Sequence, residues 1–497
     1  MPHAADIGPK VHAMTPASIA LSRFGYGIDA RGTAPQDPRR WLLHQLDRYD
    51  PAPAVITSRT RARDNIGETL GLLRSVRRET LEAVGMAAQE SMMAEMARGD
   101  AREEALTNLP PALRERYAES RAMLGQDIAV RVNLAVSSPA PLMERLVHFW
   151  ANHFSVSVGK IGTQVAVGDH EFSAIRPHVL GRFSDLLEAA TLHPAMLLYL
   201  DQFQSIGPNS PAQRRRAQRQ GAGGPRGLNE NLAREILELH TLGVDGGYSQ
   251  ADVTEFARAL TGWTVPGIGQ ADRFGEAQSS GAMFVGVAHE PGARQVLSRS
   301  YPAGAADQAR AILRDLAAHP ATARHVSTKL ARHFAGDTPP PALVARLEGD
   351  FLRTGGDLAS LTRTLIEAPE AWQPGPVKFR TPFEWLVASL RLTGVEELPP
   401  RRIITALTQL GHVPWRAPSP AGYDDIAASW AGPDALLRRV DLAAQIARDA
   451  TLEDVTARAE VAFPGALSDY TRTQLARAES GKQALALLLV SPEMLRR

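Results

Sequence analysis

Cysteine is missing from all 497 residues of the sequence. A chain without thiols forms no disulfide, carries no thiolate nucleophile and holds no cysteine-ligated iron–sulfur cluster or zinc knuckle. Any metal ion would have to be bound mainly by histidine, aspartate or glutamate. The candidate functional groups of this chain are therefore imidazoles and carboxylates.

An excess of charge of one sign is also missing, because 55 basic residues face 54 acidic ones and the formal net charge is +1. Such a chain has no overall field that attracts nucleic acid or an anionic membrane surface. No run of residues approaches the roughly eighteen apolar residues that a membrane-spanning helix needs. We therefore expect no nucleic-acid partner and no membrane insertion.

Export and cofactor motifs are not found either. Residues 1–30 contain neither an unbroken apolar segment nor a twin-arginine pair, so the sequence as it stands predicts a cytoplasmic protein. A periplasmic or secreted location follows only if a signal peptide has been removed. The sequence also has no GxGxxG, Walker, GxSxG, HExxH or CxxCH motif, which disfavours the common nucleotide, haem and zinc-protease classes.

What the sequence does contain is typical of a large helical protein. A proline-free stretch from 57 to 109 carries apolar residues at helical spacing, which predicts a long amphipathic helix. After residue 306, further helical patterns are separated by short proline-bearing turns, which favours antiparallel packing. We expect a predominantly all-α fold, either an irregular multi-helix bundle or an α/α toroid-like array.

The breaks between these helical patterns, which are rich in proline and glycine, suggest how the chain is organised. We expect one large helical unit over residues 1–497, with an N-terminal helical part at 1–203, a central motif at 228–264 and a C-terminal helical part at 306–497. The stretches 204–227 and 265–305 are rich in proline, glycine or serine and are interpreted as loops or insertions. Within the second, the run MFVGVAH is the best strand candidate and predicts a small β-hairpin.

The first segment that could carry chemistry is Leu142–Phe154, LMERLVHFWANHF. On a helix, Glu144, His148 and Asn152 form one polar stripe because they are four residues apart. Glu and His at this spacing can bind a divalent ion, although the metalloprotease pattern of two histidines is missing. The alternative is an ion-paired helix with His153 satisfied in the core.

The second segment spans residues 227–264 and contains NLAREILELHTLGVDGGY. Its apolar stripe has Glu235 on one flank and His240 on the other. A carboxylate close to an apolar face must be hydrogen-bonded, paired or protonated, because an isolated buried charge is costly. Arg234 and Arg258 are the candidate partners for this carboxylate.

The two segments can be combined into one hypothetical site. Glu235, Glu238 and His240 would then join His148 and His153 around a divalent metal ion or a hydrolytic water. The competing interpretation is that acidic side chains three residues apart on one helix are solvated or salt-bridged, which is the commoner case.

Other polar residues are weaker candidates. His178, His193 and His289 lie beside or within two residues of a proline, where hydrogen bonding at a turn is the commoner role. Trp263 could be a platform for a sugar ring, but residue preferences favour a place in the core.

Several blocks of the sequence together resemble a known family. These blocks are HFWANHFSVSVGK, IRPHVLGRFSDLL, HPAMLLYLD, GLNENLAREILELHTLGVDGGYSQADVTEFARALTGWT and the closing SPEMLRR. They are similar to the bacterial family called domain of unknown function 1800, from about Ala20 to the last arginines. The resemblance implies a mostly helical protein that is often exported and often encoded beside a sulfatase-like or alkaline-phosphatase-like partner. The chain departs from the family at Glu290, where relatives more often have His followed by Asp, which weakens a site at His289.

The favoured hypothesis is a hydrolase or lyase that acts on a polymer such as a polysaccharide. One glutamate would act as general acid or base, the histidines would bind a metal or polarise the reacting group, and two asparagines would orient it. The candidate site residues come from the two helical segments and are Glu235, Glu238, His240, Asn152, Asn231, His148 and His153.

Two other classes remain open. One is a non-catalytic maturation or assembly partner of a sulfatase-like protein, in which the same polar groups form a buried network and residues 204–227 contact another protein. A concave pocket reached by His148, Glu235 and His240 would favour the enzyme, and sealed groups would favour the partner. The other class is a redox protein with a histidine-ligated iron or copper centre.

Overall fold

The computed structural model describes residues 13–30, 32–59, 64–73, 75, 111–159, 161–220, 227–269, 271–395 and 397–497. These residues are predominantly helical, which confirms the predicted mostly-α fold, and their strands are only two or three residues long. The predicted helix over 57–109 is described only in part, because residues 64–73 are helical and residues 76–110 lie outside the described ranges. None of the described helices has the length and apolar character that crossing a bilayer requires.

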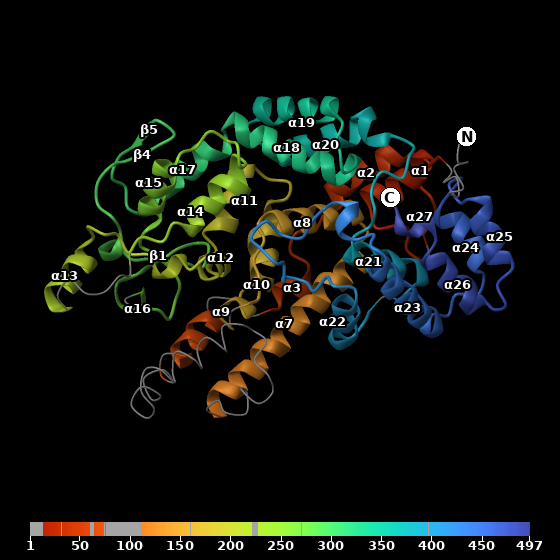
Figure 1. Cartoon of the computed structure of the whole chain (residues 1–497), viewed down its shortest axis with the longest axis horizontal. Coiled ribbons are helices and arrows are strands. Elements are labelled where there is room, and N and C mark those ends of the chain that lie inside the picture. Colours follow the sequence, from red (N-terminus) through yellow and green to blue (C-terminus); the bar gives the residue numbers. More distant parts are fainter. Residues whose placement is uncertain are drawn as a thin grey trace, which may run out of the picture.

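Helix α8 (Pro141–His153) runs through the middle of the molecule (Figure 1). Pro141 opens it at a position where a missing N–H costs nothing, and almost all of its residues are buried. A helix that is buried on every side must satisfy its polar side chains within the protein. This requirement makes α8 the element around which polar contacts gather.

The N-terminal helices surround α8, and α7 projects from the body of the molecule (Figure 1). A π-helical turn at Ala20–Phe24 follows α1, and another at His170–Ile175 follows α10. The helices of this part are α1 (Pro16–Ile19), α2 (Pro38–Arg48), α3 (Ala54–Thr57), α7 (Pro111–Ser137), α8, α9 (Ile161–Gln164), α10 (Val167–Asp169), α11 (Phe183–Thr191) and α12 (Pro194–Tyr199).

The middle of the chain forms one end of the molecule and then returns across α8 through α18, α19 and α20 (Figure 1). A third π-helical turn, Ile236–Thr241, directly follows α14. The helices of this part are α13 (Pro211–Gln220), α14 (Asn231–Glu235), α15 (Gln250–Leu260), α16 (Ala271–Phe274), α17 (Ala306–Ala317), α18 (Pro320–Ala335), α19 (Pro341–Thr354) and α20 (Leu358–Glu367).

The C-terminal helices form the opposite end, where α1 and the C-terminus of the chain also lie (Figure 1). The main chain of Lys378 pairs with that of Arg497, which fixes the end of the chain against the segment before α21. These helices are α21 (Pro382–Thr393), α22 (Pro400–Gln409), α23 (Pro433–Asp449), α24 (Val455–Ala462), α25 (Asp469–Ala476), α26 (Gly481–Leu489) and α27 (Pro492–Leu495).

The two segments expected to be loops differ. Residues 265–305 contain short strands, which pair antiparallel with one another and with β1 (Trp263–Thr264) just before them. Strand β3 (Met283–Phe284) lies between β1 and β2 (Glu276–Ala277), and β4 (Arg294–Val296) pairs with β5 (Arg299–Tyr301). The loop predicted over 204–227 instead contains helix α13. Its run of Ala, Arg and Gln consists of good helix formers, and Pro211 occupies the first turn, where proline is tolerated.

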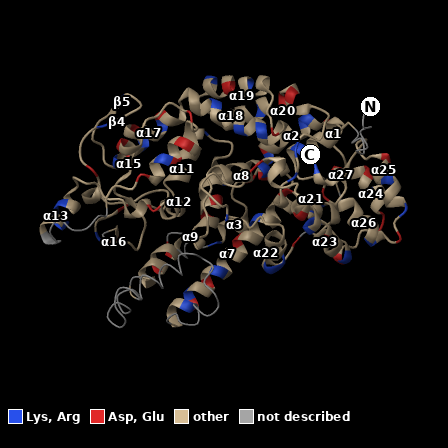
Figure 2. Ribbon diagram, viewed as in Figure 1, with Lys and Arg blue, Asp and Glu red and all other residues tan. Residues whose placement is uncertain are grey.

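Charged residues of both signs are interspersed along the helices in Figure 2. This distribution agrees with the balanced composition. Several charged side chains are also buried in the interior of the protein.

Candidate functional site

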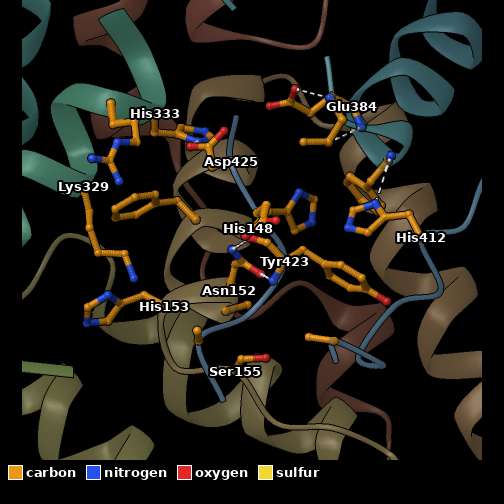
Figure 3. A pocket seen from close by; sticks show the side chains of 18 of the residues that line it. His148, Asn152, His153, Ser155, Lys329, His333, Glu384, His412, Tyr423 and Asp425 are labelled. Carbon is orange, nitrogen blue, oxygen red and sulfur yellow. Dashed lines mark hydrogen bonds and ion pairs between the residues drawn. The ribbon is translucent and has the colours of Figure 1, made fainter. Parts of the chain in front are cut away.

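Helices α8 and α18, together with the chain segment at residues 412–426, surround a cavity of about 400 Å³. Figure 3 shows its side chains, which include His148 and Asn152 from α8, Lys329 and His333 from α18, and Tyr423 from the segment. The volume falls within the range of about 300–1,000 Å³ that is common for small-molecule sites. This cavity is the candidate functional site.

The polar stripe of α8 has a separate partner at each turn. Glu144 accepts two hydrogen bonds from the guanidinium of Arg176, at 2.7 and 3.0 Å, so it serves as half of a buried ion pair. Asn152 bonds the main chain of Tyr423 with both of its side-chain atoms, at 2.9 and 2.8 Å, and so attaches the segment at 412–426 to α8. The predicted stripe exists, but its members do not converge on one ion.

His148 lines the cavity with a defined hydrogen-bond partner behind it. Its Nδ1 lies 2.7 Å from the hydroxyl of Tyr26, which is buried. A buried hydroxyl needs an acceptor for its proton, so Tyr26 donates to Nδ1 and the neutral imidazole carries its own proton on Nε2. Burial and the nearby guanidinium of Arg131 hold the pKa of His148 well below its usual range, which keeps the ring uncharged.

A second stripe, on α18, contributes three side chains to the same cavity. His325, Lys329 and His333 are four residues apart and therefore share one face of the helix. His325 donates from Nε2 to the carbonyl of Leu239 at 3.0 Å. This stripe was missed in the sequence, although the spacing in HVSTKLARH is the same signal that identified the stripe on α8.

His333 is oriented by a carboxylate. Its Nδ1 donates to Asp425 at 2.8 Å, and Asp425 also pairs with the ammonium of Lys378 at 3.0 Å. The second ring nitrogen, Nε2, lies 3.5 Å from Nη1 of Arg145, a long contact that engages its lone pair weakly. Burial lowers the pKa of His333, and its hydrogen-bonded partners lower the pKa of Asp425 to about 2. The arrangement is a neutral imidazole held by an ionised carboxylate.

The acidic group at the back of the cavity is completely paired. Glu384 accepts hydrogen bonds from Arg145 and from Nε of Arg497, the latter at 3.2 Å, and Nη2 of Arg497 lies at an ion-pair distance of 2.9 Å. These two guanidinium groups hold the pKa of Glu384 well below its usual range, despite its burial. Glu384 therefore acts as a structural anion that keeps two buried arginines satisfied.

Lys329, unlike Glu384, is a charged residue of the cavity without an ion-pair partner among the described residues. Its side chain extends toward His153 in Figure 3, and burial lowers its pKa to about 8. Arg332, one position before His333, opposes its charge further. The ammonium of Lys329 has no ion pair with any carboxylate in the described ranges, and the same holds for the guanidinium of Arg332.

His153 and His240 lie together but in different surroundings. Their rings are 6.0 Å apart, and His153 donates from Nε2 to the main-chain carbonyl of His240 at 3.1 Å. His153 lines the cavity, whereas His240 is fully buried behind it. Burial lowers the pKa of His240 to about 3 and that of His153 well below its usual range, so both rings are neutral. His240 is a buried core histidine.

The carboxylates of the second segment are not among the cavity's lining residues. Glu235 is half-buried with a raised pKa, caused by burial and by the neighbouring Glu238, which itself accepts from the hydroxyl of Tyr248. The arginines suggested as partners bind elsewhere, Arg234 to Glu230 and Arg258 to Glu255. Asn231 is exposed at the start of α14. The structure thus brings Asn152, His148 and His153 into the cavity and leaves Glu235, Glu238 and Asn231 outside it.

The weaker candidates have structural surroundings. His193 caps α12 by accepting from the main-chain N–H of Ala195, and His178 bonds the carbonyl of Ala174. His289 bonds the carbonyl of Thr261, and Trp263 is buried. Hydrogen bonds at turns account for the three histidines, as their positions near prolines suggested, and Trp263 lies in the core, as residue preferences suggested.

No group of three or more histidine, aspartate or glutamate side chains within the described residues is arranged to hold a metal ion. His148, one of the two tentative ligands, has Nδ1 engaged by Tyr26. His153, the other, has Nε2 engaged by a carbonyl. The polar lining of the cavity includes neutral imidazoles, cations, phenols and the carboxylates of Glu384, Asp424 and Asp425. This set suits acid–base chemistry, and its cations suit the binding of an anion.

Comparisons with known proteins agree with the resemblance in the sequence. No curated protein and no solved structure matches the chain. The model of the family described as protein of unknown function (DUF1800) matches residues 19–496, nearly the whole chain. The protein therefore belongs to the DUF1800 family, and the cavity between α8 and α18 lies within the matched region.

Proposed function

We propose that the protein is an enzyme that cleaves a polysaccharide, and that it acts as a lyase through His333 and Asp425. The observation that carries the proposal is the geometry of this pair. Nδ1 of His333 donates to Asp425 at 2.8 Å, which leaves Nε2, contacted by Arg145 only at 3.5 Å, as the proton acceptor of a neutral ring in a cavity of suitable size. A base fixed by a carboxylate is a recurrent arrangement in proton transfer.

A lyase is favoured over a glycoside hydrolase because of the state of the carboxylates. Hydrolysis by the usual route needs two carboxyl groups across the scissile bond, about 5–9 Å apart, and one of them must be protonated. Glu384 is paired with two arginines, and Asp425 is shared between His333 and Lys378. Among the described residues that line the cavity, only Asp424 remains as a carboxylate outside an ion pair. One such group does not make the pair.

Elimination needs one group that accepts and returns a proton. His333 would take the proton from the carbon next to the carboxylate of a uronic acid, and the electron pair left behind would form the carbon–carbon double bond. The bond to the glycosidic oxygen would break, and that oxygen would take the same proton back from the His333 imidazolium. Asp425 would stabilise the imidazolium, and His148 would donate from Nε2 to the departing oxygen.

The test is incubation of the purified protein with a panel of uronate-containing polysaccharides, with neutral polysaccharides for comparison. We expect the ultraviolet absorbance of an unsaturated uronate to appear together with new reducing ends. His333→Ala should lower the rate by at least about a hundredfold if it is the base. The matched control is His44→Gln, which removes an exposed histidine on α2 and should leave the rate unchanged.

The results separate the alternatives. New reducing ends without ultraviolet absorbance would indicate hydrolysis and contradict elimination. If none of the polymers is cleaved and the His333→Ala variant also loses its fold, the paired groups are structural. The assembly partner of a sulfatase-like protein would then be the better hypothesis. The sealed position of His240 is the observation that favours that alternative.

A further inference from the structure

Two cations of α18 line the cavity without a counter-ion among the described residues. Lys329 and Arg332 both line it, and neither is within ion-pair distance of a carboxylate among the residues that the structure describes. Nε of Arg332 is also buried without a hydrogen-bond partner there. Lys329 and Arg332 are half-buried, and a charge held away from bulk water is more stable with a counter-ion than without one. The fold therefore places two cations without a described counter-ion at this end of the cavity.

The surrounding groups do not neutralise the two cations. His153 and His325 each donate a ring N–H to a main-chain carbonyl, at 3.1 and 3.0 Å, and both rings are neutral. The carboxylate whose field reaches Lys329 is Asp425. Its charge is already balanced by Lys378 and bound by His333. Within the described residues, no carboxylate is left within ion-pair distance to balance these two cations.

We propose that Lys329 and Arg332 form a subsite that binds the anionic group, a carboxylate or a sulfate, carried by a sugar ring of the substrate. The inference rests on the proposed function and names the substrate class, an acidic polysaccharide. An anion at this position would make charge-assisted hydrogen bonds with both cations. Because it would supply the charge that the fold lacks, its binding would also stabilise the protein.

The subsite and the proposed chemistry support each other. A carboxylate that is neutralised by two cations makes the proton on its neighbouring carbon more acidic, which is what a base such as His333 requires. Lys329 and His333 are one helical turn apart on α18, so an anion at Lys329 places its ring beside the His333–Asp425 pair. Lys329 and Arg332 thus act as specificity and positioning residues, and His333 acts on the ring.

The experiment measures binding of monosaccharides to the full-length protein by calorimetry, without relying on activity. The probes are galacturonate, galactose 6-sulfate and galactose. The variants are Lys329→Met, which keeps a long side chain and removes the charge, and Lys482→Met, which removes an exposed lysine as a matched control. We expect galacturonate to bind and galactose not to bind. Lys329→Met should weaken galacturonate binding by at least about tenfold, whereas Lys482→Met should have no effect.

The pH dependence provides a second readout. Galacturonate binding should weaken as the pH rises above about 8 in the wild type, because the free Lys329 ammonium loses its proton there, and should stay flat in Lys329→Met. Equal binding of galactose and galacturonate, or undiminished binding by Lys329→Met with its fold retained, would overturn the subsite. Preference for galactose 6-sulfate would support the subsite and contradict the elimination. Galacturonate binding without polymer cleavage would likewise leave the subsite standing and count against the lyase.

Discussion

Glu384 is buried and Lys329 is half-buried on the walls of one cavity, and their charges have different partners. Glu384 is held between the guanidinium groups of Arg145 and Arg497, and its pKa is well below the usual range. Lys329 has no such partner, and its pKa falls to about 8. The carboxylate of Glu384 is stabilised by ion pairs, whereas the ammonium of Lys329 is not.

The difference indicates which groups hold the structure together and which are left for a ligand. A buried ion pair fixes helices in one arrangement and becomes very costly when one partner is removed. A half-buried cation without an ion-pair partner among the described residues does not fix helices in this way, and in a cavity such a group is a candidate for ligand binding. Removing each charge in turn should therefore change the free energy of unfolding by different amounts and in different directions.

The largest effect is expected for Glu384→Gln. The substitution leaves the guanidinium groups of Arg145 and Arg497 buried beside a neutral amide, so we expect a loss of about 3–5 kcal/mol in the free energy of unfolding. Because the folded-state pKa of Glu384 is depressed, its contribution is complete above the usual carboxylate pKa and is lost as the pH falls further. Urea denaturation at neutral and acidic pH measures both effects.

The control for this variant is Glu460→Gln. Glu460 pairs with Arg472 on the surface, where both side chains are more than one-third exposed. Exposed pairs are worth about 0–1 kcal/mol, so the control should change the stability little. If both variants lose the same free energy, the burial of the Glu384 pair does not matter and the comparison fails.

A smaller effect of opposite sign is expected for Lys329→Met. The ordinary lysine pKa of 10.5 falls to about 8 in the folded protein, so the unfolded chain binds more protons between these values. Wild-type stability should therefore rise with pH over this interval, by up to about 3 kcal/mol relative to Lys329→Met. At neutral pH the variant should be the more stable protein. Denaturation curves recorded across this interval, with Lys482→Met as the control, test the expectation. A gap that does not change with pH would mean that Lys329 is solvated or paired.

The contrast between α18 and the segment around Glu235 shows what sequence reasoning could reach. Helical spacing predicted the mostly-α fold and the stripe of His148 and Asn152 on α8, because a regular helix repeats its faces. After Glu235 the chain turns into a π-helix at Ile236–Thr241, in which the main-chain N–H of Leu242 bonds the carbonyl of Leu237. The wider turn separates residues that regular spacing would place together.

The contacts between the remaining site residues could not be predicted from the sequence. His333 and Asp425 are 92 positions apart, and Tyr26 and His148 are 122 apart, so neither pair has a local signal. The ion pairs of Glu384 likewise depend on the end of the chain reaching the core. Only the stripe of His325, Lys329 and His333 had a readable pattern, and it required attention to lysine as well as to histidine and carboxylates.

The smallest effect is expected for Glu235→Gln, which provides a third kind of ionisable group, half-buried and outside the cavity. Burial and the like charge of Glu238 raise the pKa of Glu235, so its ionisation costs stability as the pH rises through that range. The variant should be more stable than the wild type at neutral pH by less than about 1 kcal/mol, and the difference should vanish in acid. Cleavage and galacturonate binding should stay within about twofold, since Glu235 does not line the cavity. A large loss of cleavage with normal stability would return Glu235 to the role of acid or base and move the active site away from Lys329.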